Sequence, residues 1–139
     1  MTANSLNSEN LRFPIGDLLG FRPVEREFGR AVVKLTAGPQ HANPMGTLHG
    51  GVLCDIADAA MGVAFSSTLE AGESFTTIEF KINFLRPFWN GDLFAEAKVV
   101  HRGKSVGYLE CEVKDETGKL ISKSNSTCIV LRGDRASGR

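Results

Sequence analysis

The chain has 139 residues, of which 42% are hydrophobic and 23% are charged, and it suits one globular domain spanning residues 1–139. Its 16 basic and 16 acidic residues balance, so we expect neither a nucleic-acid-binding module that depends on phosphate attraction nor an acidic solvating tail. No apolar run has the length of a membrane span and the N-terminus lacks the apolar core of a signal peptide, which predicts a cytoplasmic protein without membrane contact.

Short elements are predicted in the first third of the chain. Residues 1–12 are rich in Ser and Asn and are expected to be disordered. A short helix closed by glycine is predicted over residues 13–20. Apolar and polar residues then alternate on either side of a glycine, which predicts a hairpin with strands at 21–28 and 30–36. Prolines and glycines make residues 37–48 an ordered loop.

A long helix is predicted next, from about Gly50 to about Leu69, and it is apolar on nearly every face, as a buried helix would be. Two aspartates, Asp55 and Asp58, interrupt it. An ionised carboxylate inside a core is strongly disfavoured unless a partner pairs with it or the protein uses it. Stabilisation by the helix start could explain such acids, but Asp58 lies far along the helix for that effect.

Four more strands are predicted after the helix. Residues 75–84 alternate, which places Ile78 and Phe80 on one face and Thr77 on the other. The remaining segments are strands at 93–102, 105–114 and 120–131, followed by a polar tail at 133–139. The fold class is therefore α+β, with an antiparallel sheet of about six strands packed on one long central helix.

The three cysteines, Cys54, Cys111 and Cys128, are odd in number and widely spaced. This spacing fits neither a disulfide framework nor a zinc site, so no metal is expected. The cysteines are predicted to be small buried apolar residues. The sequence also contains no G-x-S-x-G elbow of a serine hydrolase and no glycine-rich phosphate loop.

The loop and the helix start carry a motif. Asn43 is followed by Gly46-Thr47-Leu48-His49-Gly50-Gly51, and Asp58 lies seven residues after Gly51. Together with the strand and turn at 75–87 and the turn at 101–105, this motif resembles the hotdog-fold acyl-CoA thioesterases of the phenylacetate-degradation (PaaI-like) type. The resemblance covers roughly residues 35–131.

The resemblance implies a hotdog fold in which the sheet wraps the helix. Subunits would associate edge to edge into a homodimer with one continuous sheet, and dimers would often pair into a homotetramer. The active sites would lie at the subunit interface. The substrate would be an acyl-CoA or aryl-CoA thioester, and no separate cofactor is implied because coenzyme A is part of the substrate.

The resemblance also implies roles for single residues. Asp58 takes the place of the catalytic carboxylate, and Gly50 that of the backbone N–H donor to the thioester carbonyl. Asn43 takes the place of the residue that orients water or the carbonyl, and Thr77 that of a hydroxyl contributed across the interface. The substrate-binding candidates are His49 and Gly51 of the motif, Phe88 in the turn after residue 84, and Arg102 and Lys104, which could bind phosphates of coenzyme A.

The chemistry of these residue types favours acyl transfer. Negative charge develops on the carbonyl oxygen, and a glycine N–H at a helix start can approach that oxygen closely. A carboxylate about two turns along could act as general base or as nucleophile, and both roles stay open. Asp55 lies three residues before Asp58, so their repulsion should raise one pKa of the pair, while the helix dipole acts in the opposite direction.

Two other functions stay open. A hotdog dehydratase or hydratase would pair the helical acid with His41 or His49, although a histidine just before a helix is more often a cap or a packing residue. A non-catalytic acyl-CoA-binding protein would bind its ligand without turnover. Arg102 and Lys104 could equally be solvated residues beside a turn.

Overall fold

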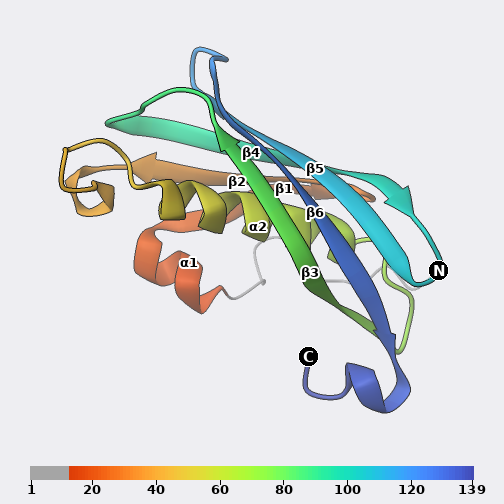
Figure 1. The fold of residues 1–139 in the computed structure, drawn as a ribbon. Coiled ribbons are helices and arrows are strands. Elements are labelled where there is room, and N and C mark those ends of the chain that lie inside the picture. The colour runs from red at the N-terminus through yellow and green to blue at the C-terminus, as the bar shows by residue number, and fades with distance from the viewer. Residues whose placement is uncertain (1–12) are drawn as a thin grey trace.

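The computed structural model describes residues 13–139, so the expectation for residues 1–12 lies outside the described residues. Figure 1 shows how the elements are arranged. In chain order they are α1 (Pro14–Leu19), β1 (Phe21–Glu27), β2 (Arg30–Ala37), the 3₁₀ turn η1 (Pro39–His41), α2 (Gly50–Ser66), β3 (Glu73–Phe84), β4 (Gly91–Arg102), β5 (Val106–Asp115), β6 (Leu120–Arg132) and the 3₁₀ turn η2 (Gly133–Ala136). Each strand begins and ends within two residues of its predicted bounds, and the predicted tail begins with η2.

Within residues 13–139, the strands form one antiparallel sheet in the order β1-β2-β4-β5-β6-β3. Both helices lie on the same side of this sheet in Figure 1. The long helix α2 packs chiefly against β2 and β4, and the core between them includes the fully covered side chains of Ile56, Phe65, Val33 and Leu93. This is the predicted α+β arrangement, a sheet wrapped on one long helix.

Helix α2 begins at Gly50, and His49 caps it by accepting a hydrogen bond on its side chain from the Gly51 N–H. The helix ends at Ser66 and does not continue to Leu69 as predicted. The hydroxyls of Ser66, Ser67 and Thr68 each donate to a carbonyl three residues earlier, at distances of 2.6–2.7 Å. Such bonds compete with the helical backbone pattern, which explains the early end.

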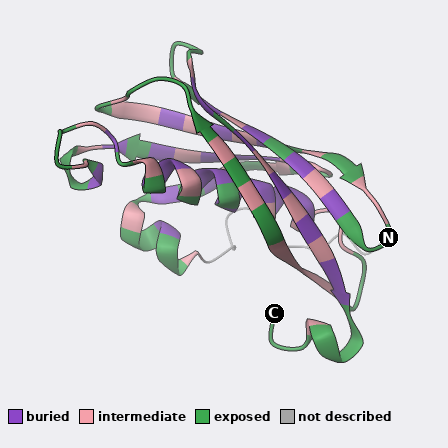
Figure 2. Cartoon of the chain, in the orientation of Figure 1, coloured by how far each residue is buried: buried purple, intermediate pink, exposed green. Residues whose placement is uncertain are grey.

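Most of α2 is buried, and exposed positions interrupt it, as Figure 2 shows. Gly51, Asp55 and Asp58 are exposed, while Cys54 and Gly62 are intermediate. Their spacing of three and four residues places them on one face of the helix. The two carboxylates therefore lie on an open stripe and not inside the core of the single chain, and neither is in the first helical turn that helix capping would require.

Strand β3 departs from the predicted alternation in its middle. The register with β6 shifts between Thr77 and Glu79, so Ile78 forms a β-bulge. Ile78 is 55% exposed, whereas Thr77 pairs with Cys128, which is buried in the core. The prediction that placed Ile78 with Phe80 on one face and Thr77 on the other is wrong, because the inserted residue reverses the alternation.

The cysteines follow the prediction in part. Cys111 and Cys128 are buried, but Cys54 on α2 is only partly covered, and all three thiols are free. Among the described residues, no helix has the length and apolar character needed to cross a bilayer.

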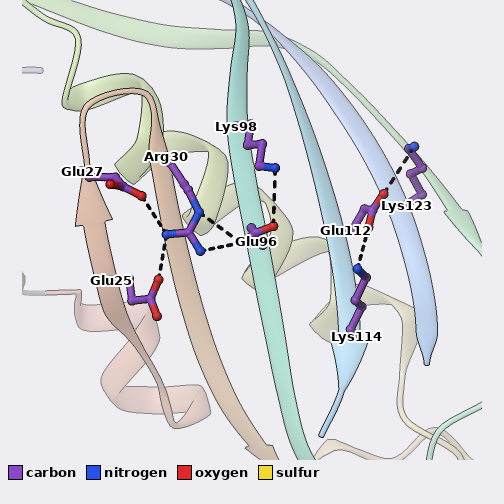
Figure 3. A network of polar contacts seen from close by, with 8 residues as sticks. All are labelled: Glu25, Glu27, Arg30, Glu96, Lys98, Glu112, Lys114 and Lys123. Atoms are coloured by element: carbon purple, nitrogen blue, oxygen red, sulfur yellow. Dashed lines mark hydrogen bonds and ion pairs between the residues drawn. The ribbon is translucent and has the colours of Figure 1, made fainter. Parts of the chain in front are cut away.

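The outer face of the sheet carries a network of charged side chains, drawn in Figure 3. Arg30 on β2 forms ion pairs with Glu25 and Glu27 of β1 and with Glu96 of β4. Further along the same face, Glu112 of β5 pairs with Lys114 and with Lys123 of β6. Pairs of this kind contribute little to stability but keep a surface solvated. The apolar side of the molecule is the opposite one, where α2 lies.

Candidate active site

The start of α2 presents a free hydrogen-bond donor. The N–H groups of Gly51 and Val52 donate to His49, at 2.8 and 3.0 Å. No residue within 13–139 accepts a hydrogen bond from the Gly50 N–H. The unpaired donor and the helix dipole together make this position attractive to a developing oxyanion. Gly50 thus has the feature that the sequence-based hypothesis requires.

A cavity of about 400 Å³ opens beside this donor. It is lined by Leu48, Gly50, Leu53, Phe84, Leu85, Arg86, Pro87 and Phe88. The Phe84 ring lies so close to Gly50 that a Cβ added there would be 2.9 Å from the ring. Phe88 lines the cavity, and its carbonyl accepts a hydrogen bond from the Leu48 N–H at 2.8 Å; its predicted contact with substrate stays a prediction. An apolar group attached to a carbonyl at Gly50 could occupy this space.

Asn43 organises the loop before α2. Its side-chain oxygen accepts hydrogen bonds from the N–H groups of Met45 (2.9 Å) and Thr47 (3.2 Å), and its amide nitrogen donates to Thr47 Oγ1 at 2.7 Å. The asparagine amide thus holds the loop that leads to His49, as asparagine does in turns of this kind. In this arrangement Asn43 acts on the position of the helix start and does not itself face the cavity lining.

Both histidines of this region have structural roles. His41 is 3% exposed; its Nδ1 accepts from the Gly38 N–H (3.0 Å), and its Nε2 lies 2.6 Å from the Leu19 carbonyl oxygen. His49 caps α2, which confirms the capping interpretation of that residue. Both ring nitrogens of His41 are therefore engaged, whereas His49 is exposed and only its Nδ1 has a partner among the described residues.

Asp58 lies on the exposed stripe of α2, eight residues after Gly50. It keeps contact with solvent in the single chain, but the surrounding protein removes part of its hydration and this raises the pKa of its carboxyl group. The charge of Asp55 acts in the same direction. Desolvation is the larger cause of the shift and the charge of Asp55 the smaller one, so the coupling of the two carboxylates stays a prediction.

Thr77 of β3 contacts Cys128 of β6, and Cys128 lies within range of the Asp58 charge. The Thr77 hydroxyl is 3.7 Å from the Cys128 Sγ. Burial raises the pKa of the Cys128 thiol, and the nearby charge of Asp58 contributes to the same shift. The sequence hypothesis named Thr77 but missed Cys128. The signal was present in the alternation of Ser122, Ser124, Ser126 and Cys128, all of which are buried on the inner face of β6.

The structure does not bring Gly50 and Asp58 together within one chain. They belong to the same helix, and eight residues of α-helix span about 12 Å along the axis. A carbonyl carbon close to the Gly50 N–H is therefore out of reach of the Asp58 carboxylate of the same chain. We call Gly50 with its cavity the donor half-site, and Asp58 with Thr77 the acid half-site.

The guanidinium of Arg102 is engaged in contacts within its own chain. It donates to Thr68 Oγ1 (3.1 Å), to the Gly103 carbonyl (2.6 Å) and to Glu73 Oε1 (2.8 Å), and it lies 5.3 Å from the centroid of the Phe65 ring. Lys104 is exposed, and its ammonium group has no partner among the described residues. Of the two residues predicted to bind phosphates, only Lys104 is free to do so in this arrangement.

Glu73 joins two arginines where β3 begins. Its carboxylate binds Arg102 on one oxygen and Arg132 on the other, at 2.8 and 2.6 Å, and only 7% of the side chain is exposed. It also accepts from the Glu70 N–H at 2.8 Å. Burial alone would raise the pKa of Glu73, but the hydrogen bonds from Glu70 and Arg132 and the two arginine charges outweigh it and lower the pKa. We call Arg102, Glu73 and Arg132 the arginine latch.

Replacing Glu73 with glutamine is expected to lower the free energy of unfolding by about 1–3 kcal/mol near pH 7, because two guanidinium groups lose a covered carboxylate. The pKa of Glu73 is lower in the folded chain than in the unfolded chain. Its contribution is therefore present above the unfolded value of about 4.3 and lost as the pH falls through the folded value. Urea unfolding from about pH 3 to about pH 8 measures this difference.

The matched control is Glu79→Gln, which changes an exposed carboxylate on the same strand that has no ion pair among the described residues. Its free energy of unfolding should depend on pH in the same way as that of the wild type. If the free energies of unfolding of wild type and Glu73→Gln differ by the same amount at every pH, the charge of Glu73 is not the source of the stabilisation.

Comparison with known proteins agrees with this fold and motif. The family model of the Thioesterase superfamily matches residues 45–122. The acyl-coenzyme A thioesterase PaaI of Escherichia coli is 37% identical over 106 residues, which cover 75% of this chain and 73% of that protein. The 1,4-dihydroxy-2-naphthoyl-CoA hydrolase of Listeria monocytogenes is 33% identical over 116 residues, which cover 84% of this chain and 94% of that protein.

The solved structure of the E. coli PaaI protein superposes on this chain with a TM-score of 0.82 at 29% identity, covering 88% of this chain and 87% of that one. The family match spans more than half of the chain and includes Gly50, Asp58 and Thr77. The chain, with its sheet wrapped on α2, belongs to the hotdog-fold Thioesterase superfamily.

Proposed function

We propose that this protein hydrolyses acyl-CoA thioesters to a free acid and coenzyme A. The observation that carries the proposal is the unpaired Gly50 N–H beside an apolar cavity, on the same helix as a carboxyl group of raised pKa. The names of the two relatives described above, which specify CoA thioester hydrolysis, support the same reaction class.

In the proposed reaction the Gly50 N–H donates a hydrogen bond to the thioester oxygen as charge develops on it. Either Asp58 removes a proton from the attacking water, or the Asp58 carboxylate attacks first and water then hydrolyses the resulting anhydride. A C–O bond forms, the C–S bond breaks, and the coenzyme A sulfur leaves as a thiolate that takes up a proton. Thr77 is proposed to hold the water or the carboxylate from β3.

We further propose that two chains share each site, as a homodimer that could pair into a homotetramer. The separation of the donor half-site from the acid half-site supports sharing. The edge strand β3 is 12 residues long and contains no proline, whereas the other edge strand, β1, has 7 residues and contains Pro23. Both edges carry a register irregularity, but a short strand with a proline discourages strand addition, so β3 is the proposed edge of association.

The direct test is release of free thiol from a panel of acyl-CoA and aryl-CoA thioesters. The proposal requires turnover of at least one of them that depends on Asp58. Hydration of an enoyl-CoA without thiol release would favour a dehydratase or hydratase, although both ring nitrogens of His41 and the Nδ1 of His49 are engaged in hydrogen bonds. Binding of every thioester without turnover would favour a non-catalytic acyl-CoA-binding protein.

Lys104 is proposed to bind phosphates of coenzyme A from the β4–β5 turn, next to the arginine latch. Its exposed ammonium has no partner among the described residues. A group so far from the reacting carbon would strengthen the binding of substrate and transition state equally, and would act on KM more than on kcat.

Replacing Asp55 with asparagine is expected to move the acidic limb of kcat/KM to lower pH while most activity at pH 8 remains. The charge of Asp55 contributes to the raised pKa of Asp58, so its removal makes Asp58 easier to ionise. The acidic limb should still lie above the ordinary pKa of an aspartate, because desolvation raises the pKa of Asp58 more than the charge of Asp55 does. A pH–rate profile of both proteins measures the shift. An acidic limb that stays in place or moves upward would mean that the carboxylates are not coupled in this way.

A further inference from the structure

The cavity at the start of α2 is lined by one charged residue. Seven of its eight lining residues are apolar or glycine, and the eighth is Arg86. Arg86 is exposed, and its guanidinium has no partner among the described residues. By contrast, Arg30, Arg102 and Arg132 each form ion pairs with carboxylates. Arg86 is therefore a free cation at the rim of an apolar space.

The position of Arg86 is fixed on both sides. The N–H groups of Leu85 and Arg86 donate to the Ile121 carbonyl, at 2.9 and 3.2 Å. Two residues further along, the Phe88 carbonyl accepts from Leu48 in the loop that leads to α2. Pro87 restricts the backbone between these contacts. The guanidinium thus extends from a segment that is anchored to both β6 and the donor half-site.

Filling the cavity would change the environment of this guanidinium. Arg86 is exposed to solvent, but a ligand against Phe84, Leu85 and Phe88 would displace part of the surrounding water. Dehydration of a charge is unfavourable unless an oppositely charged or strongly polar atom replaces the water. A guanidinium at this rim therefore favours ligands that carry an anionic oxygen, which it can bind through two parallel hydrogen bonds.

On the basis of the proposed function, we propose that Arg86 is a specificity-determining residue that binds an anionic oxygen of the acyl-CoA substrate. The Gly50 N–H would hold the thioester carbonyl, and the apolar lining would contact the carbon chain. Two parts of the substrate could supply the anion. One is a carboxylate at the far end of the acyl group, and the other is a phosphate of coenzyme A.

The experiment compares Arg86→Gln and Arg86→Lys with wild type on four thioesters, in which hexanoyl or adipoyl groups are carried by coenzyme A or by pantetheine. The two acyl groups differ only in the distal carboxylate, and the two carriers differ in the 3'-phosphoadenosine diphosphate part of coenzyme A, which holds all of its phosphates. If Arg86 binds the acyl carboxylate, Arg86→Gln should lower kcat/KM for both adipoyl thioesters at least about tenfold and leave both hexanoyl thioesters unchanged. If it binds a phosphate, KM should rise for both coenzyme A thioesters and stay constant for both pantetheine thioesters.

Arg86→Lys should recover part of either loss, because it keeps the charge but not the paired donors. The control is Arg22→Gln, which replaces an exposed arginine on β1 at the opposite edge of the sheet. It should change neither KM nor kcat/KM for any of the four thioesters. Equal turnover of all four thioesters by Arg86→Gln and wild type would overturn the proposal. So would an equal loss on all four, since hexanoyl-pantetheine carries no anion and its loss would indicate a structural role.

Binding separates this proposal from the proposed function. The chain has one tryptophan, Trp89, which is 56% exposed and follows the cavity residue Phe88. Its fluorescence can report binding of adipate and of free coenzyme A without any turnover. If wild type hydrolyses no thioester, the proposed function fails, but binding of either anion that Arg86→Gln loses would still support the role of Arg86. Titrations that are identical for wild type and Arg86→Gln would overturn it.

Discussion

Replacing Asp58 with asparagine will lower kcat for acyl-CoA hydrolysis by at least about a hundredfold, because the reaction loses its base or its nucleophile. The variant should fold and associate as the wild type does. Asp58 is exposed in the single chain and takes no part in the core packing of α2. Initial rates of thiol release under saturating substrate measure the loss, and sedimentation checks the assembly.

The stability of Asp58→Asn gives a second measurement. A carboxyl group whose pKa is raised in the folded chain disfavours folding when the pH lies above its unfolded value. Removing this charge should therefore leave Tm near pH 7 unchanged or higher, as expected for a residue kept for function at the expense of stability. Asp55→Asn removes a charge from the same helix face and should keep most of its activity. Near-normal turnover by a folded Asp58→Asn protein would end the proposal that Asp58 is the catalytic carboxylate.

Replacing Gly50 with proline should lower kcat about 10²–10³-fold, since proline removes the backbone N–H proposed to stabilise the oxyanion. The substitution suits the local backbone. Gly50 is the first residue of α2, where proline is favoured because its missing N–H has no helical partner. The preceding residue, His49, has φ −64° and ψ 132°, which is the extended conformation that proline requires before it.

Gly50→Ala is the matched control for this prediction. It adds a Cβ that meets the Phe84 ring at 2.9 Å, as proline also does, but it keeps the N–H. Phe84 is 54% exposed, so its ring has room to move. Alanine should therefore cost much less activity than proline, and kcat values from both variants measure the difference. Equal losses in the two variants would attribute the effect to crowding at Phe84 and not to the missing donor.

The fold could be predicted from the sequence because its signals are local. Turn residues separate each strand from the next, and the apolar run after Gly50 is too long and too evenly apolar for a surface helix. The errors have physical causes. Hydroxyl side chains at Ser66 and Ser67 end the helix early by bonding to its own carbonyls, and a bulge at Ile78 turns Thr77 toward the core.

The candidate site could be predicted only in part. The helix-start glycine and the helical acid are visible in the sequence, and so is the capping role of His49. The ion pair between Arg102 and Glu73 could not be predicted, because these residues are 29 positions apart and meet only when β3 and β4 are in place. Arg86 and Cys128 were missed since their significance comes from what surrounds them in space, a cavity in one case and Thr77 in the other.

In the proposed dimer, each site combines Gly50 of one chain with Asp58 of another. Co-expression of Gly50→Pro and Asp58→Asn chains in equal amounts tests this sharing of residues. In a mixed dimer, the intact Gly50 of the Asp58→Asn chain would face the intact Asp58 of the Gly50→Pro chain. One of its two sites would then be whole. Random pairing makes half of the dimers mixed, so we expect about a quarter of wild-type activity per chain, from two variants that are each nearly inactive alone. Activity of the mixture no higher than that of the separate variants would contradict a shared site.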